Sequence, residues 1–200
     1  KEAARAENLL RGALALDPKN FRARELLGLI LKTNKKYLEA RTLLEGLVRD
    51  DPKRPVAWRT LGLMAMSEER YDDAEKAFLE LQHLRPLEET SYQNLAGIYL
   101  VRKNIPGAIA QLMELQAHEQ HDERIPRKLA ELIRSSGNNL REAETMAYKA
   151  IRINPYNAIN HELMASILME EKEPGRAVEY YRHATELQPG QGAYWTGLAE

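Results

Sequence analysis

The sequence predicts an all-α protein in which pairs of helices stack on one another along the chain as a solenoid. The spacing of the prolines is the first observation behind this prediction. Pro52 and Pro86 follow Pro18 at intervals of 34 residues, and Pro189 follows Pro155 at the same interval. Self-similarity at a fixed period of this length is the signature of a helical repeat array.

Two further series of residues keep the same period. One is a series of alanines, with one extra residue before its fifth member: Ala6, Ala40, Ala74, Ala108, Ala143 and Ala177. The other is a series of Leu-Gly or similar pairs that begin at Leu27, Leu61, Leu95, Leu129, Met164 and Leu198. Three independent series with one shared period indicate a true repeat.

Each repeat contains two runs of residues with helical spacing, and each run is too short to form a stable helix alone. In residues 55–88 the first run places Trp58 and Leu61 on one stripe, and the second run places Phe78 on another. A single repeat cannot bury both stripes, so neighbouring repeats must stack and share a continuous core. We therefore expect helix pairs, with small residues such as Gly62 at the close contacts within a pair.

Polar breaks separate the two runs of each repeat, and a proline ends the second run. In residues 123–157 the break is Ser-Gly-Asn-Asn at 136–139. We expect this break to contain the one extra residue, because loops tolerate insertions. Asp51 precedes Pro52, and a residue before proline avoids the helical region, so a helix should end there.

These residues resemble the tetratricopeptide repeat, whose 34-residue unit reads Trp-x2-Leu-Gly-x2-Tyr, then Ala-x3-Phe, then Pro. Residues 55–88 give the best match, through Trp58, Leu61, Gly62, Ala74, Phe78 and Pro86. Ala65 departs from the pattern where Tyr is preferred, and Gln120 departs from it where Pro should close another repeat.

The resemblance covers the whole chain and implies a right-handed superhelix of stacked antiparallel helix pairs. The implied full repeats are 21–54, 55–88, 89–122, 123–157 and 158–191. Residues 1–20 resemble the second half of an earlier repeat, and residues 192–200 resemble the start of a later one. We therefore expect a single solenoid over residues 1–200 that is a fragment of a longer protein.

Composition and charge argue against several classes of protein. The net charge of −1, from 29 basic and 30 acidic side chains, gives no electrostatic footprint for nucleic acid. No stretch approaches the ~18 apolar residues that span a bilayer. There is no cysteine for a disulfide or a thiolate metal site. We expect a soluble protein of the cytoplasm or the periplasm, and the residues do not decide between these compartments.

The sequence shows no motif that carries catalysis, a cofactor or a metal ion. It has no glycine-rich phosphate loop, nucleophile elbow or metalloprotease signature. His118 and His121 lie three residues apart, but a metal site needs further ligands, so we interpret them as surface residues. His161 occupies the position of Trp58 and Tyr92 in earlier repeats, which favours packing over ligation. We therefore expect no enzyme activity, no cofactor and no metal.

Repeat arrays of this family generally bind partners on a concave face, which the resemblance assigns to the first helix of each repeat. The positions that the resemblance leaves exposed include an apolar set and a polar set. The apolar set comprises Leu29, Val56, Leu63, Met66, Leu100 and Val101. The polar set comprises Arg59, Gln93, Arg124, Arg127 and Arg134. Arginine suits the carboxylates of a partner, because its planar guanidinium binds them with two hydrogen bonds.

A simpler interpretation of these positions stays open, in which they serve the fold alone. Neighbouring helices would then cover part of the apolar set, and the arginines would pair with Glu131 and Glu162 of the same face.

The sequence thus predicts a scaffold that binds a protein or peptide segment with acidic and apolar residues in its concave groove. Two alternatives stay open. In one, the chain is the repeat arm of a larger enzyme or of an envelope or polymer-secretion machine. In the other, the solenoid assembles with copies of itself. None of these readings predicts binding of nucleic acid or a membrane span in this segment.

Overall fold

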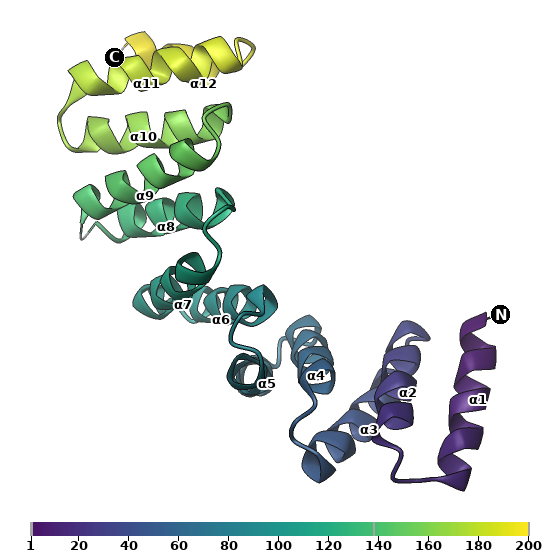
Figure 1. Ribbon diagram of the computed structural model, residues 1–200. Helices are drawn as coiled ribbons and strands as arrows, with labels where there is room; N and C mark the ends of the chain where they lie inside the picture. Colours follow the sequence, from purple (N-terminus) through teal and green to yellow (C-terminus); the bar gives the residue numbers. More distant parts are fainter. Residues whose placement is uncertain (1, 138, 200) are drawn as a thin grey trace. The chain divides into compact units, whose positions relative to one another are not determined.

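The computed structural model describes residues 2–137 and 139–199, and within them it contains twelve α-helices and no strand (Figure 1). The first six helices are α1 (Glu2–Leu16), α2 (Phe21–Thr33), α3 (Tyr37–Asp50), α4 (Pro55–Ser67), α5 (Tyr71–Leu84) and α6 (Glu89–Val101). The last six are α7 (Ile105–His118), α8 (Arg124–Ser136), α9 (Leu140–Ile153), α10 (Ala158–Glu170), α11 (Pro174–Leu187) and α12 (Gly192–Ala199). None of these helices combines the length and the apolar character that crossing a membrane requires.

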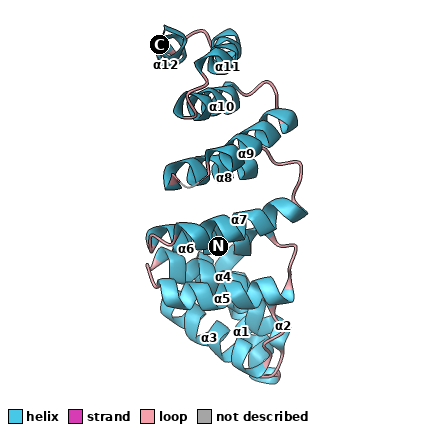
Figure 2. Cartoon of the chain, turned by 90° about the vertical axis from the view of Figure 1, so that its left-hand side faces the viewer, coloured by secondary structure: helices cyan, strands magenta, loops and turns pink. Residues whose placement is uncertain are grey.

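The helices form two compact units, Lys1–Ile98 and Tyr99–Glu200. Within each unit, consecutive helices joined by short turns pack as antiparallel pairs (Figure 2). The pairs α2–α3 and α4–α5 lie in the first unit, and the pairs α8–α9 and α10–α11 lie in the second. The first helices of neighbouring pairs also touch, α2 with α4 and α8 with α10. The predicted all-α class with stacked helix pairs is therefore confirmed.

Glycine sets the distance between the two helices of a pair at two places. A Cβ atom on Gly28 would lie 2.5 Å from Cδ2 of Leu44, and one on Gly62 would lie 2.9 Å from the ring of Phe78. Leu44 and Phe78 are fully buried. A larger residue at either glycine would overlap a core side chain, which confirms the predicted close contacts.

The turn within a pair uses a residue with positive φ at the same position of successive repeats. Four of these residues are not glycine and have φ between 57° and 63°: Lys35, Glu69, Lys103 and Lys172. A left-handed conformation costs such a residue about 1 kcal/mol. The turn after α2 is closed by a hydrogen bond of 2.9 Å from the backbone N–H of Lys36 to the carbonyl oxygen of Leu31.

The helix bounds do not confirm the predicted place of the extra residue of the fourth full repeat. Its turn spans residues 137–139, as long as the turn at 102–104, whereas the connection between α7 and α8 spans residues 119–123 and that between α5 and α6 only 85–88. Gly137, with φ of 69°, takes the positive-φ position in the turn after α8. Two residues separate Gly137 from the start of α9 at Leu140, whereas one residue separates Lys103 from the start of α7 at Ile105. Asn138, which belongs to the predicted break, lies outside the described residues.

A ring nitrogen or hydroxyl in the first helix of four repeats lies within hydrogen-bond distance of the carbonyl oxygen of a proline six residues earlier. The pairs are Trp58 Nε1 with Pro52 O (2.7 Å), Tyr92 Oη with Pro86 O (2.8 Å), His161 Nε2 with Pro155 O (2.8 Å) and Trp195 Nε1 with Pro189 O (2.9 Å). This contact explains why the prolines and the aromatic position share one period. His161 is buried and makes it too, so the structure places it as a packing residue.

Ion pairs connect the second helix of one repeat to the turn of the next. The carboxylate of Glu7 in α1 accepts hydrogen bonds from Lys36 at 2.7 Å and from Arg11 at 2.9 Å. These bonds, with that from Lys36 the strongest cause, lower the pKa of Glu7 from 4.5 to about 2. Thirty-four residues after Glu7, Arg41 pairs with Glu68, which stands at the position of Asn34, and the amide of Asn34 donates to Glu7.

Candidate protein-interaction site

Helix α4 carries two apolar stripes, and only one of them belongs to the core. Leu61 and Met64 face the core and are at most 8% exposed. Val56, Leu63 and Met66 are only half-buried. Their spacing of seven and three residues places these three on one stripe of the helix. The second stripe therefore offers apolar surface that the repeat itself does not fully use.

The other predicted residues of the first unit lie on α2, α4 and α6. Leu29 lies on α2, which contacts α4, and it is half-buried. Arg59 lies on the same stripe of α4, and its Nη1 is 3.2 Å from Oε1 of Glu88. Gln93 of α6 is exposed, and its side-chain amide donates a hydrogen bond to Glu89. Neighbouring helices thus cover part of the apolar set without burying it.

In the second unit the predicted arginines of α8 are already paired. Arg124 Nε donates to Asp122 Oδ1 at 2.9 Å, and this bond is the main reason that the pKa of Asp122 lies below its ordinary value. Arg134 Nε lies 3.7 Å from Glu170 Oε1 on α10. Leu100 of α6 is half-buried.

The prediction that these arginines pair with Glu131 and Glu162 is wrong. Glu131 lies 3.3 Å from Lys128, and Glu162 accepts a hydrogen bond of 2.9 Å from Ser166. Both contacts are between residues three or four apart on one helix, where side chains meet most easily. The arginines pair instead with carboxylates at the start of α8 and on α10.

Glu123 ties the start of α8 to α10. Its carboxylate accepts hydrogen bonds from the side-chain amides of Asn157 at 2.7 Å and Asn160 at 3.2 Å. Arg127, the remaining predicted arginine, lies 3.9 Å from the same carboxylate. The charge of Arg127 therefore serves the packing of α8 as well as its surface.

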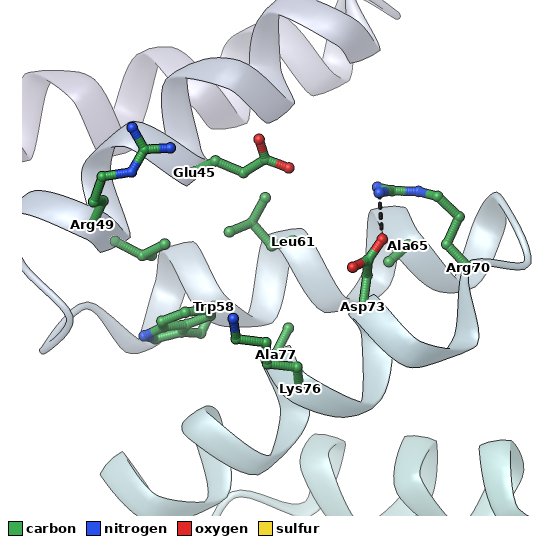
Figure 3. Close-up of a pocket in the computed structure, with 10 residues that line it drawn as sticks. Glu45, Arg49, Trp58, Leu61, Ala65, Arg70, Asp73, Lys76 and Ala77 are labelled. Carbon is green, nitrogen blue, oxygen red and sulfur yellow. Dashed lines mark hydrogen bonds and ion pairs between the residues drawn. The ribbon is translucent and has the colours of Figure 1, made fainter.

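A pocket that the sequence analysis did not predict lies between α3 and α5, over α4 (Figure 3). Its volume is about 370 Å³. Its apolar lining consists of Val48, Trp58, Leu61, Ala65 and Ala77. Its charged lining consists of Glu45, Arg49, Arg70, Asp73 and Lys76. None of the predicted groove residues lines it.

The same pocket occurs one repeat earlier, between α1 and α3, with a volume of about 460 Å³. Each residue that lines it lies 34 residues before a residue of the pocket over α4: Arg11, Leu14, Ala15, Leu27, Glu39, Thr42 and Leu43. The period of the sequence was therefore the signal that could have predicted both pockets.

The two pockets differ in the charges at their rims. In the earlier pocket Arg11 Nη2 reaches from α1 to Glu39 Oε1 on α3 at 2.6 Å. Thirty-four residues later the same positions hold Glu45 and Asp73, which are both acidic and cannot pair. Asp73 pairs with Arg70 at 2.6 Å instead (Figure 3). The repeat thus fixes the shape of the pocket, and the residues that do not repeat set its chemistry.

Among the described residues no three His, Asp or Glu side chains gather where they would hold a metal ion.

Models of the tetratricopeptide repeat match residues 1–64, 59–121 and 161–191. Together these segments cover most of the chain. A comparison with curated protein sequences gives no match.

Solved structures show the same fold at low sequence identity. YrrB, described as a TPR protein with an unusual peptide-binding site, is 13% identical over 96% of this chain and 98% of its own, with a TM-score of 0.76. PilF of Pseudomonas aeruginosa is 19% identical over 99% of this chain and 90% of its own, with a TM-score of 0.66. MamA of Desulfovibrio magneticus RS-1 is 18% identical over 86% of this chain and 97% of its own, with a TM-score of 0.66. By its sequence period, its helix pairs and these matches, the chain belongs to the tetratricopeptide repeat family.

Proposed function

We propose that this protein is a non-catalytic scaffold whose first helices bind a segment of a partner protein, with α4 at the apolar centre of the surface. Membership of the family supports a role in protein–protein interaction in general. The half-buried stripe of Val56, Leu63 and Met66 supports placing the centre of the binding surface on α4. A partner that covers the stripe gains about 25 cal/mol for each Å² of apolar surface that it removes from water.

The polar residues around the stripe favour a partner that also carries acidic side chains. Arg59 is part of the stripe, and its side chain is 39% exposed although it pairs with Glu88. The exposed part of the guanidinium can still accept a carboxylate of the partner, because its planar fork carries several N–H donors. Gln93 is exposed and offers further hydrogen bonds. The partner segment that fits is therefore apolar with acidic residues beside the apolar ones.

The test uses a partner isolated with the full chain as bait and identified by mass spectrometry. Its binding segment is synthesised as a labelled peptide, and its affinity is measured by fluorescence anisotropy. We expect the double variant Leu63→Glu/Met66→Glu to bind at least about tenfold more weakly, a difference of about 1.4 kcal/mol. The reason is that binding would then bury carboxylates without partners.

The control is Leu79→Glu, which introduces one glutamate in place of an exposed apolar residue on α5, a second helix. Leu79 is 44% exposed, so this change should alter neither the fold nor the affinity. Circular dichroism should show unchanged helix content in both variants. Equal affinity of Leu63→Glu/Met66→Glu and the natural chain would contradict the proposal.

A further inference from the structure

We infer that a second binding surface lies between α7 and α9 and takes an acidic segment of a partner protein. A pocket of about 610 Å³ opens near the C-terminal ends of these two helices. It is lined by Gln116, Gln120, His121, Lys149, Arg152 and Ile153. Both helices are second helices of their repeats, so this surface goes beyond the first-helix surface proposed above.

The pocket carries positive charge that the protein does not neutralise. Lys149 and Arg152 are both exposed and lie three residues apart on one face of α9. Neither has an ion-pair partner among the residues that the structure describes, and no carboxylate belongs to the described lining. Thirty-four residues later the same two positions hold His183 and Glu186, which lie 3.5 Å apart. Two cations at such positions repel each other, so an anion between them is favourable.

The pocket also forms where the chain departs from its own repeat. Gln120 stands at the position of Pro86 and Pro155 in the neighbouring repeats. His121 follows it, where those repeats have Leu87 and Tyr156. Exceptions to an otherwise regular pattern are where functional sites are expected. The two substitutions border the same pocket as the two unpaired cations.

Two features of the lining favour a peptide over a nucleic acid. Ile153 adds an apolar contact. The side-chain amide of Gln116 donates to the carbonyl oxygen of Glu119 at 3.1 Å, but its Oε1 is buried and accepts no hydrogen bond from the described residues. A peptide N–H supplies the donor that this oxygen lacks once the amide rotates toward the pocket, whereas an ionised phosphate has none. Two cations on a chain of net charge −1 are also too few for the electrostatic grip that nucleic acids require.

The test uses a fluorescein-labelled peptide Glu-Ile-Glu-Glu-Ile-Glu and the same peptide with glutamine in place of glutamate. Anisotropy is measured with the full chain at physiological ionic strength. We expect the acidic peptide to bind with a dissociation constant of about 1 mM or tighter, and the glutamine peptide to bind at least about tenfold more weakly. The double variant Lys149→Glu/Arg152→Glu should bind the acidic peptide at least about tenfold more weakly than the natural chain does.

Arg141→Glu is the matched control for this variant, because Arg141 is exposed at the other end of α9 and outside the pocket. It should change the affinity by less than about twofold, since charges beyond ~8 Å are screened at this ionic strength. Leu63→Glu/Met66→Glu should also keep this binding. Its failure to do so would place the peptide on the first helices and overturn the inference.

Other outcomes overturn it as well. One is the absence of binding at millimolar peptide, and another is equal affinity of the two peptides. A third is that Lys149→Glu/Arg152→Glu binds the acidic peptide as tightly as the natural chain does. A fourth is a single-stranded oligonucleotide that binds as tightly as the peptide and is lost in the same variant. That result would assign the pocket to nucleic acid.

Discussion

Helices α4 and α8 occupy the same place in two repeats, 68 residues apart, yet they present different surfaces. The corresponding residues are Val56 with Arg124, Leu63 with Glu131, and Met66 with Arg134. The arginines of α8 already pair with carboxylates of the protein, whereas the apolar residues of α4 are left half-buried. The repeat therefore fixes how a helix packs, while its exposed positions can differ in charge and polarity without disturbing that packing.

The largest expected effect concerns the packing behind the two helices. Gly62 of α4 faces Phe78, and the corresponding positions behind α8 hold Ala130 and Ala147. Phe78→Ala should lower the free energy of unfolding by about 3–5 kcal/mol, because it leaves a cavity in the core. Chemical denaturation measures this loss.

The same pair offers a double-mutant cycle. Gly62→Ala alone should destabilise the protein, because overpacking costs about 1–3 kcal/mol and alanine recovers only about 1 kcal/mol of helix propensity. In the Phe78→Ala background the same change recreates the Ala–Ala arrangement of α8 and should stabilise. An equal effect of Gly62→Ala in both backgrounds would refute the compensation between the two positions.

The next effect tests whether α8 is anchored in a way that α4 is not. Glu123 binds Asn157 and Asn160, and the position of Glu123 holds Pro55 in the repeat of α4. Glu123→Ala should lower the free energy of unfolding by about 1–3 kcal/mol, because it leaves the partly buried amide of Asn157 without an acceptor. It also removes one acceptor of the Asn160 amide, which keeps the carbonyl oxygens of Ala150 and Asn154. Glu131→Ala, which removes the carboxylate near Lys128, is the control and should change it by less than about 0.5 kcal/mol. Similar losses in both variants would contradict the anchoring role.

A third prediction concerns pH, where the two helices should behave alike. Asp51 accepts a hydrogen bond from Arg54 before α4, and Asp122 accepts one from Arg124 before α8. These bonds lower the pKa of both aspartates below the ordinary 3.8. A lowered pKa stabilises the folded state above pH 3.8, and this contribution is lost as the pH falls below that value.

Asp51→Asn and Asp122→Asn should therefore be less stable than the natural chain at pH 7, and the difference should shrink at pH 3. Thermal unfolding followed by circular dichroism at both pH values measures it. A difference that persists undiminished at pH 3 would mean that the two ion pairs do not stabilise the helix starts.

The smallest expected effect is that of Arg134→Met, which gives α8 the residue that α4 has at Met66. The side chain of Arg134 is 32% exposed and its pair with Glu170 is 3.7 Å long. Its removal should change the free energy of unfolding by less than about 0.5 kcal/mol. A loss above 1 kcal/mol in chemical denaturation would show that the arginine face of α8 is structural.

The fold was predictable from the sequence because each packing position recurs with a fixed period. Gly62 opposite Phe78 is an example, because Gly28 faces Leu44 in the same way one repeat earlier. The partners of the surface charges were not predictable in the same way. Arg134 reaches Glu170 on a neighbouring repeat rather than Glu131 on its own helix, and such choices depend on side-chain directions that a period does not encode.

The pockets between the second helices were missed for a different reason. The resemblance to the family places binding on the first helices, so it gives no reason to expect a site between second helices. Lys149 and Arg152 look like ordinary surface charges in the sequence, and only the fold brings Gln120 and His121 beside them. The sequence alone shows that Gln120 is an exception, because the neighbouring repeats have Pro86 and Pro155 at its position. It does not show that Gln120 borders a pocket.

The most direct test of the account is a methyl NMR titration of the full chain with the binding segment of its partner. Leu63 and Met66 of α4 should show the largest shift changes, followed by Leu29 of α2, because a bound segment would cover the half-buried stripe. Leu79 on α5 should not change. Shifts at Leu79 with none at Leu63 and Met66 would contradict the central claim that the first helices bind the partner.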